Sequence, residues 1–302
     1  MSGCVFSNCS SPSDGVNGRC EGCGSLIKNE MIRQRYIVEK VINRSKFGVN
    51  YLVKDSNKDS TFKIVKELQP VSEDDPDFYS VRRSTVERLF EREARVLMGL
   101  HHPGIPRLYA AFEEKSFAYL VEEYIPGTTL LESLDKSNRS KITEAEARRI
   151  LKELATILVY LHSRVPAVVH RDIKPQNLMF AEDDGRLLLV EFAAVSQHAQ
   201  KSTNSTVVGT AGYAPTEQLY GQAVPQSDLY AAGATILRLI TGVHPSKLYN
   251  PIEKQFIWHS QANVTPAFAC IIDGLLAQDL TERTSSAEQL LLELEILRPL
   301  PG

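Results

Sequence analysis

The chain has 302 residues, a length that suits one large two-lobed domain or two modest domains. Its apolar fraction of 43% and charged fraction of 24% are typical of globular proteins and exclude a disordered or fibrous chain. Lysine and arginine total 34 against 37 aspartate and glutamate residues, and the net charge of −3 gives no support to a nucleic-acid-binding or polybasic membrane surface.

No apolar run reaches the roughly 18 residues that a transmembrane helix needs. The first residues lack the basic and apolar regions of a secretory signal. We therefore expect a cytoplasmic protein without a membrane span, in which cysteines are not paired as disulfides.

Four of the five cysteines lie within the first 23 residues, and these are Cys4, Cys9, Cys20 and Cys23. Their spacing, C-x4-C followed by C-x2-C, can surround one Zn²⁺ with four thiolates. Such a closed site leaves no position for water, so we expect a structural zinc-ribbon-like module over residues 1–30. The alternative is a disordered tail with reactive thiols. The fifth cysteine, Cys270, lies in an apolar run and is expected in the core.

Short apolar stretches alternate with turns after residue 35 and predict a β-rich segment. The expected strands are Tyr36–Val41, Val49–Val53, Thr61–Val65, Arg107–Phe112 and Phe117–Val121, with a helix at Thr85–Leu100. Beyond Pro126 the apolar spacing becomes helical, and Thr143 with Glu146 forms a capping box. Further helices are expected at Asp228–Thr241, Pro266–Ala277 and Ser286–Leu297. A cleft between two lobes of different type is a natural ligand site.

The sharpest motif is the octapeptide His-Arg-Asp-Ile-Lys-Pro-Gln-Asn at residues 170–177. It resembles the catalytic loop of serine/threonine protein kinases, H-R-D-x-K-x-x-N, and further hallmarks follow from about residue 36 to 297. The resemblance implies an α+β, bilobal protein kinase-like fold over residues 31–302, with a small β-rich N-lobe at 31–124 and a larger helical C-lobe at 125–302. The cysteine module resembles the arrangement in certain cyanobacterial serine/threonine kinases.

The resemblance also assigns the chemistry. Phosphoryl transfer needs positioning and charge neutralisation more than covalent help. Asp172 would accept or orient the proton of a substrate hydroxyl, Lys174 would neutralise the moving γ-phosphate, and Asn177 would hold one Mg²⁺. The implied cofactors are ATP with Mg²⁺ or Mn²⁺, and the implied partner is a protein substrate. Thr210 matches the family position that contacts the substrate and Asp172.

Lys66 shares one face of its predicted strand with apolar residues, so it needs a partner. Glu93 falls within the apolar stripe of the predicted helix, where an unpaired carboxylate would be costly. The resemblance makes these two residues the ion pair that orients the nucleotide α- and β-phosphates. It places Glu123 and Ile125 at the hinge of the nucleotide site.

Two structural contacts are implied as well. Glu217, in the Tyr-Ala-Pro-Thr-Glu stretch that ends the activation segment, would pair with Arg283. Asp228 would hold the backbone of the catalytic loop.

Two motifs depart from the family pattern. The family's metal-binding tripeptide Asp-Phe-Gly is Glu-Phe-Ala at residues 191–193. The extra methylene of Glu191 moves the metal-binding carboxylate by about a bond length. Catalytic geometry is sensitive to displacements of about 1 Å. The phosphate-covering loop keeps only Gly48, because the family's first two glycines fall on Asn43 and Ser45. Arg44 and Lys46 could replace some of the lost interaction with charge.

The sequence therefore supports two functions. The first is an ATP-dependent serine/threonine-type protein kinase with weakened activity, favoured by the complete catalytic loop and the retained charge of Glu191. The second is a pseudokinase, a scaffold or regulator of a protein partner, favoured by departures that cluster around one ligand. The sequence leaves the choice open.

Overall fold

The computed structural model describes residues 3–13, 15, 17–45, 48–57, 61–68, 94–115, 117–192, 196–197 and 209–297. The chain divides into two compact units, one of Met1–His101 with Pro106–Ile125 and one of His102–Ile105 with Pro126–Gly302. Across the described ranges, no helix has the length and apolar character needed to cross a membrane.

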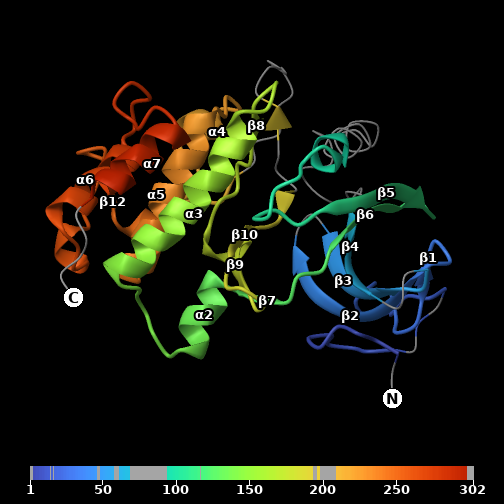
Figure 1. Ribbon diagram of the computed structural model, residues 1–302. Coiled ribbons are helices and arrows are strands. Elements are labelled where there is room, and N and C mark those ends of the chain that lie inside the picture. The colour runs from blue at the N-terminus through green and yellow to red at the C-terminus, as the bar shows by residue number, and fades with distance from the viewer. Residues whose placement is uncertain are drawn as a thin grey trace. The chain divides into compact units, whose positions relative to one another are not determined.

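The first unit is built on a six-stranded antiparallel sheet with the order β1-β2-β3-β4-β6-β5 (Figure 1). Its strands are β1 (Met31–Ile32), β2 (Tyr36–Ser45), β3 (Gly48–Asp55), β4 (Phe62–Leu68), β5 (Leu108–Glu114) and β6 (Phe117–Glu123). Most of these segments are rich in the aromatic and β-branched residues that favour strands. The strands expected from the sequence are confirmed, and β2 runs further than expected, to Ser45.

One face of this sheet carries the unit's core, and the cysteine-bearing segment packs on it. Val49, Tyr51 and Val65 belong to the core cluster, as does Leu26 of the N-terminal segment. We call this face the module face. Because side chains alternate along a strand and Val65 is on the module face, Lys66 lies on the opposite face, beside Asn50 of β3 and Leu120 of β6.

The predicted helix Thr85–Leu100 is described only from residue 94 onward. Residues 94–98 are helical, and Ala94, Leu97 and Leu100 are buried. Glu93, the expected partner of Lys66, lies outside the described residues.

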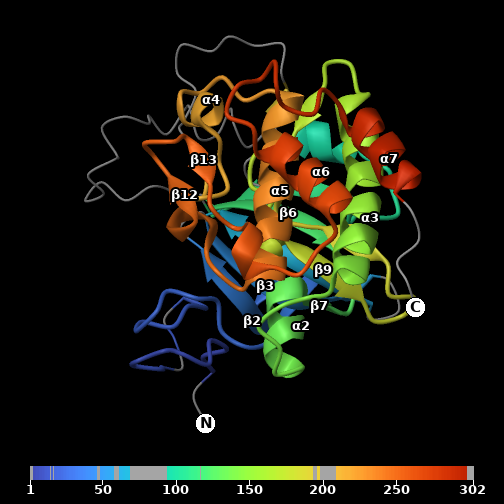
Figure 2. The ribbon, with the colours of Figure 1, turned by 90° about the vertical axis from the view of Figure 1, so that its left-hand side faces the viewer.

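The second unit is mainly helical (Figure 2). Its helices are α2 (Leu130–Lys136), α3 (Glu144–His162), α4 (Thr216–Leu219), α5 (Pro225–Thr241), α6 (Pro266–Leu276) and α7 (Ala287–Ile296). Helix α3 packs against α5 and α7, and α5 packs against α6. The predicted capping box is confirmed, since Thr143 and Glu146 each accept a hydrogen bond from the other's backbone N–H. The three later helices also form where the sequence predicted them.

Short strands and 3₁₀ turns complete this unit. They are β7 (Gly127–Thr129), β8 (Val168–Val169), η2 (Pro175–Asn177), β9 (Leu178–Ala181), β10 (Leu187–Leu189), β11 (Ser196–Gln197), η4 (Pro245–Lys247), β12 (Tyr249–Asn250), β13 (Gln255–Phe256) and η5 (His259–Gln261). Strands β9 and β10 pair antiparallel with Leu189 opposite Leu178. This register brings the residues after β10 next to the end of η2.

Cys270 is exposed, so the expectation that it belongs to the core is wrong. It lies on α6, which buries its neighbours Ala269 and Ile271. An apolar run on a helix turns about 100° per residue, and one of its members can therefore face outward.

Candidate active site

The residues of the predicted catalytic loop, in the second unit, are in direct contact. Lys174 Nζ donates to Asp172 Oδ2 at 2.8 Å, and Asn177 Nδ2 donates to the same oxygen at 2.9 Å. Asn177 also donates to the backbone oxygen of Asp172 at 2.7 Å. The 3₁₀ turn η2, with Pro175 in its first turn, folds Asn177 back toward Asp172. The three residues that the sequence singled out therefore form one cluster.

Thr210 completes this cluster from a distant part of the chain. Its hydroxyl donates to Asp172 Oδ1 at 2.7 Å and accepts from Lys174 Nζ at 2.9 Å. The expected contact between Thr210 and Asp172 is confirmed. With three side-chain donors on its carboxylate, Asp172 is held in one orientation.

Asp228, in the first turn of α5, binds the backbone of the loop at residues 170–177. Its buried carboxylate accepts from the backbone N–H groups of His170 at 2.8 Å and Arg171 at 2.9 Å, and it also contacts His162 Nε2 at 3.0 Å. The predicted role of Asp228 is confirmed. Arg171 adopts φ 68°, a strained value for a side-chain-bearing residue, and these two amide bonds help to hold it.

His170 links the loop to the segment that carries Glu191. The ring is fully buried, and burial lowers its pKa, so it is neutral at pH 7. Its Nδ1 accepts from Asp172 N–H at 3.3 Å, which leaves Nε2 to donate to the Val190 carbonyl at 3.3 Å. The sequence assigned His170 no separate role, although its place two residues before Asp172 in the predicted catalytic loop was a signal.

Glu191 follows β10 and lies beside the predicted catalytic loop in the second unit. The N–H of Val190 donates to the Asn177 carbonyl at 2.9 Å, which ties the two candidate metal ligands together through the backbone. Glu191 is half-buried and adopts φ 64°. The backbone of Glu191 is therefore in the left-handed region, which is strained for a residue with a side chain. Ala193 lies outside the described residues.

The first unit carries the other nucleotide candidates. Lys66 is buried on β4, opposite Asn50 and Leu120. Gly48 opens β3 with φ 154°, and a Cβ there would lie 1.9 Å from the Glu67 carbonyl oxygen. Glycine is therefore required at this position because the β2–β3 hairpin approaches the backbone of β4 too closely for a side chain.

The hinge candidates end the first unit. Glu123 closes β6, where its N–H donates to the Arg107 carbonyl at 2.8 Å and its carboxylate accepts from Arg107 N–H at 3.2 Å. Ile125 is half-buried and lies beyond the end of β6. These bonds fix the strand that leads into the hinge.

Arg44 departs from the sequence expectation. Its guanidinium donates to the Cys23 carbonyl and the Ser25 hydroxyl, and it lies 5.1 Å from the Phe6 ring. The idea that Arg44 replaces a phosphate contact is wrong, because these three partners all belong to the cysteine module. Lys46 lies outside the described residues.

The predicted contact between Glu217 and Arg283 is confirmed. Arg283 Nη1 lies 2.6 Å from Glu217 Oε1, and the arginine side chain is fully buried. Next to this pair, Gln218 Nε2 donates to the Arg171 carbonyl at 2.6 Å. The Gln218 contact was missed, because it joins positions 47 residues apart and no local pattern signals it.

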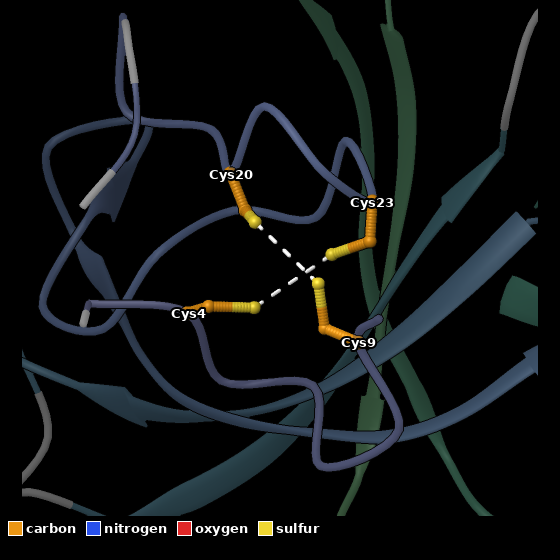
Figure 3. A group of neighbouring side chains, drawn as sticks. All are labelled: Cys4, Cys9, Cys20 and Cys23. Carbon is orange, nitrogen blue, oxygen red and sulfur yellow. Dashed lines mark hydrogen bonds between the residues drawn. The ribbon is translucent and has the colours of Figure 1, made fainter. Parts of the chain in front are cut away.

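The four N-terminal cysteines point toward a common centre (Figure 3). All four sulfur atoms lie within 4.8 Å of one another. Cys4 and Cys23 are 3.7 Å apart, and Cys9 and Cys20 are 3.8 Å apart. Burial raises the pKa of Cys4 to about 12, whereas hydrogen bonds from Ser13 lower the pKa of Cys20 to about 5.

Comparison with known proteins agrees with this geometry. The chain matches the family described as "Protein kinase domain" over residues 36–293. It is 35% identical to serine/threonine-protein kinase PknA of Nostoc sp., over 88% of this chain and 48% of PknA. It is 34% identical to serine/threonine-protein kinase B of Synechocystis sp., over 98% of this chain and 52% of that protein. The chain thus spans about half the length of these relatives.

The fold has a counterpart among solved structures. The Mycobacterium tuberculosis PknI kinase domain matches with a TM-score of 0.70 and 22% identity, covering 90% of this chain and 99% of that one. At this identity the likeness concerns the fold alone.

Proposed function

The chain belongs to the protein kinase family, and from that premise we propose that it is an ATP-dependent serine/threonine protein kinase whose metal site works below full efficiency. The observation that carries the proposal is the intact Asp172–Lys174–Asn177–Thr210 cluster. A carboxylate oriented by three donors is the kind of fixed geometry that phosphoryl transfer requires.

The hydrogen bonds of the cluster suggest how each group acts. A carboxylate offers about four acceptor positions. Lys174 and Asn177 both donate to Asp172 Oδ2, and Thr210 donates to Oδ1. Oδ1 thus keeps one lone pair for a substrate hydroxyl, whose proton Asp172 would accept as the oxygen attacks the γ-phosphate. Lys174 has a third ammonium proton that can bond a phosphate oxygen as charge moves.

The metal donors fit Mg²⁺ or Mn²⁺ in type. The amide nitrogen of Asn177 is bonded to Asp172, so its Oδ1 is the atom that would ligate a cation. Glu191 would supply a carboxylate oxygen, and both are the hard oxygen ligands that Mg²⁺ prefers. The bound cation would neutralise phosphate charge. Because Mg²⁺ demands near-ideal geometry, the extra methylene of Glu191 weakens the site. A loss of about 3 kcal/mol would slow transfer roughly a hundredfold.

Lys66 would hold the nucleotide phosphates, with Glu93 as its partner, and Gly48 would let the loop backbone approach them. The backbone of Glu123 and Ile125 would receive adenine. The substrates would be proteins bearing serine or threonine hydroxyls.

We further propose that Cys4, Cys9, Cys20 and Cys23 bind one structural Zn²⁺. A tetrahedral site with Zn–S bonds of about 2.3 Å requires sulfur atoms about 3.8 Å apart. The separations of 3.7 and 3.8 Å for the two crossing pairs meet that requirement. Ser13 donates to Cys20 Sγ from its backbone and its hydroxyl, which is support of the kind that metal ligands receive from neighbouring groups.

Transfer of radiolabel from [γ-³²P]ATP to a generic basic protein, in Mg²⁺ and in Mn²⁺, tests the proposal. Transfer that disappears in Asp172→Ala supports the kinase. Nucleotide binding without transfer in either metal would instead support the alternative, a pseudokinase that regulates a protein partner.

A further inference from the structure

The cysteine module is attached to the strand that leads into the phosphate-covering loop. Arg44, one residue before the end of β2, donates to the carbonyl of Cys23 and to the hydroxyl of Ser25. Earlier in the same strand, the N–H of Val41 donates to the Val5 carbonyl at 3.3 Å. Both contacts reach the segments that carry the cysteines, since Val5 follows Cys4 and Ser25 follows Cys23 by two residues.

The strand register explains why Arg44 reaches the module and not the phosphates. Arg44 pairs with Val49, whose side chain belongs to the core of the module face. Asn43 and Ser45 flank Arg44, so their positions belong to the opposite face, which also carries Lys66. Positions 43 and 45, where the family has glycine, therefore belong to the same face of the sheet as Lys66. Arg44, between them, contacts the cysteine module on the module face.

A second anchor holds the strand that carries Lys66. Arg19 makes a bidentate ion pair with Glu67, at 3.0 and 2.7 Å, and the Glu67 side chain is fully buried. Tyr119 OH donates to the same carboxylate at 2.9 Å. Arg19 directly precedes Cys20, and Glu67 directly follows Lys66. The module thus binds β4 at Glu67, one residue from Lys66, and this contact lies on the face of the sheet opposite to Lys66.

From these contacts we propose that the zinc-loaded cysteine module positions the β2–β3 hairpin for nucleotide binding, with Arg44 as the positioning residue. The inference rests on the zinc site and the nucleotide site proposed above. A loop with two glycines replaced cannot rely on close backbone contact alone to order it over phosphates. The bonds from Arg44 supply that order from the module, and they exist only while the cysteine knuckles hold the Cys23 carbonyl and Ser25 in place.

Hydrogen exchange tests the coupling without nucleotide. On zinc removal by a chelator, the amides of residues 41–45 and 48–51 should exchange about tenfold faster, since a coupling of about 1–3 kcal/mol corresponds to 5–150-fold. Arg44→Met keeps the side-chain stem but removes its donors, so it should give a large part of this acceleration while still binding one zinc per chain; the Arg19–Glu67 contact remains in this variant. Lys28→Ala removes an exposed cation from the same module and should change neither value.

Nucleotide affinity is the second readout. The Kd for a fluorescent ADP analogue should rise about fivefold or more in Arg44→Met and on zinc removal. Because coupling is reciprocal, ADP should slow zinc loss to the chelator by the same factor in the wild type and by a clearly smaller factor in Arg44→Met. Ser25→Ala removes one acceptor without touching a cysteine or the arginine, and it should give a smaller change in the same direction.

The outcomes separate the two proposals. If the zinc-loaded wild type binds no nucleotide, the proposed nucleotide site fails and exchange alone decides the coupling. If it binds nucleotide while Arg44→Met and zinc removal change neither exchange nor affinity, the coupling is wrong and the kinase proposal stands. Exchange that rises equally in Lys28→Ala would also overturn it.

Discussion

Breaking the buried pair of Arg283 and Glu217 should destabilise the second unit. Arg283 Nη1 and Nη2 reach the two carboxylate oxygens of Glu217 at 2.6 and 3.4 Å. The guanidinium also donates to the carbonyls of Ala277 at 2.8 Å, Gln226 at 3.2 Å and Gln278 at 3.2 Å. Arg283→Met would fill most of the volume but leave the Glu217 carboxylate without its counter-ion.

Removing one partner of a buried ion pair costs about 3–5 kcal/mol, because the remaining charge stays desolvated. For a unit of this size, each kcal/mol moves the unfolding midpoint by about 2–4 °C, so we expect a drop of roughly 10 °C. Differential scanning calorimetry at pH 7 measures it. Activity should fall as well, because Gln218 in the adjoining helix α4 bonds the Arg171 carbonyl.

A matched control is available on the surface of the same unit. Arg139 makes a bidentate pair with Glu146 at 2.8 and 2.7 Å, and both side chains are 42% exposed. Arg139→Met should leave the midpoint within about 2 °C of the wild type, since water screens exposed pairs. Equal shifts in the two variants would refute the reasoning from burial.

Three further outcomes are expected. Zinc affinity should rise with pH, because burial raises the pKa of Cys4 to about 12 and also raises that of Cys9, so at least these two thiols lose a proton on binding. In chelator competition, log Ka should therefore climb by about 2 or more per pH unit between pH 6 and 8, and a flat profile would contradict thiol ligation. Glu191→Asp with Ala193→Gly should increase Mg²⁺-dependent transfer, up to the roughly hundredfold that a 3 kcal/mol defect removes, and no gain in rate or nucleotide affinity would place the damage at Asn43 and Ser45 instead. Gly48→Ala would push a Cβ to 1.9 Å from the Glu67 carbonyl oxygen, so it should destabilise the first unit by about 1–3 kcal/mol in urea unfolding, whereas an unchanged midpoint would mean that the hairpin can move.

Local patterns predicted most of the fold. Short apolar stretches separated by turns located the strands of the first unit, and the capping box at Thr143 located the start of α3. The resemblance of the motif at residues 170–177 to a kinase loop singled out Asp172, Lys174 and Asn177, and the structure brings these three residues into contact. These features depend on neighbours close in sequence.

Long-range contacts could not be predicted in the same way. The bond between Arg19 and Glu67 joins residues 48 apart. The only local signal was that Lys66 and Glu67 are adjacent charges on one strand, so their side chains must point to opposite faces of the sheet. The direction of Arg44 depends on two register shifts in the β2–β3 pairing, which no sequence pattern specified. Cys270 was misjudged because apolar composition does not reveal which side of a helix faces the core.

The central claim is that the Asp172 cluster transfers phosphate, and single-turnover transfer tests it most directly. Enzyme in excess over [γ-³²P]ATP, with Mg²⁺ and a basic protein substrate, should yield phosphoserine or phosphothreonine on acid hydrolysis. Asp172→Asn should bind ADP with unchanged Kd yet transfer at least a hundredfold more slowly, because the acceptor for the hydroxyl proton is lost. Equal transfer by the wild type and Asp172→Asn, or none by the wild type in Mg²⁺ or Mn²⁺ while nucleotide is bound, would contradict the claim.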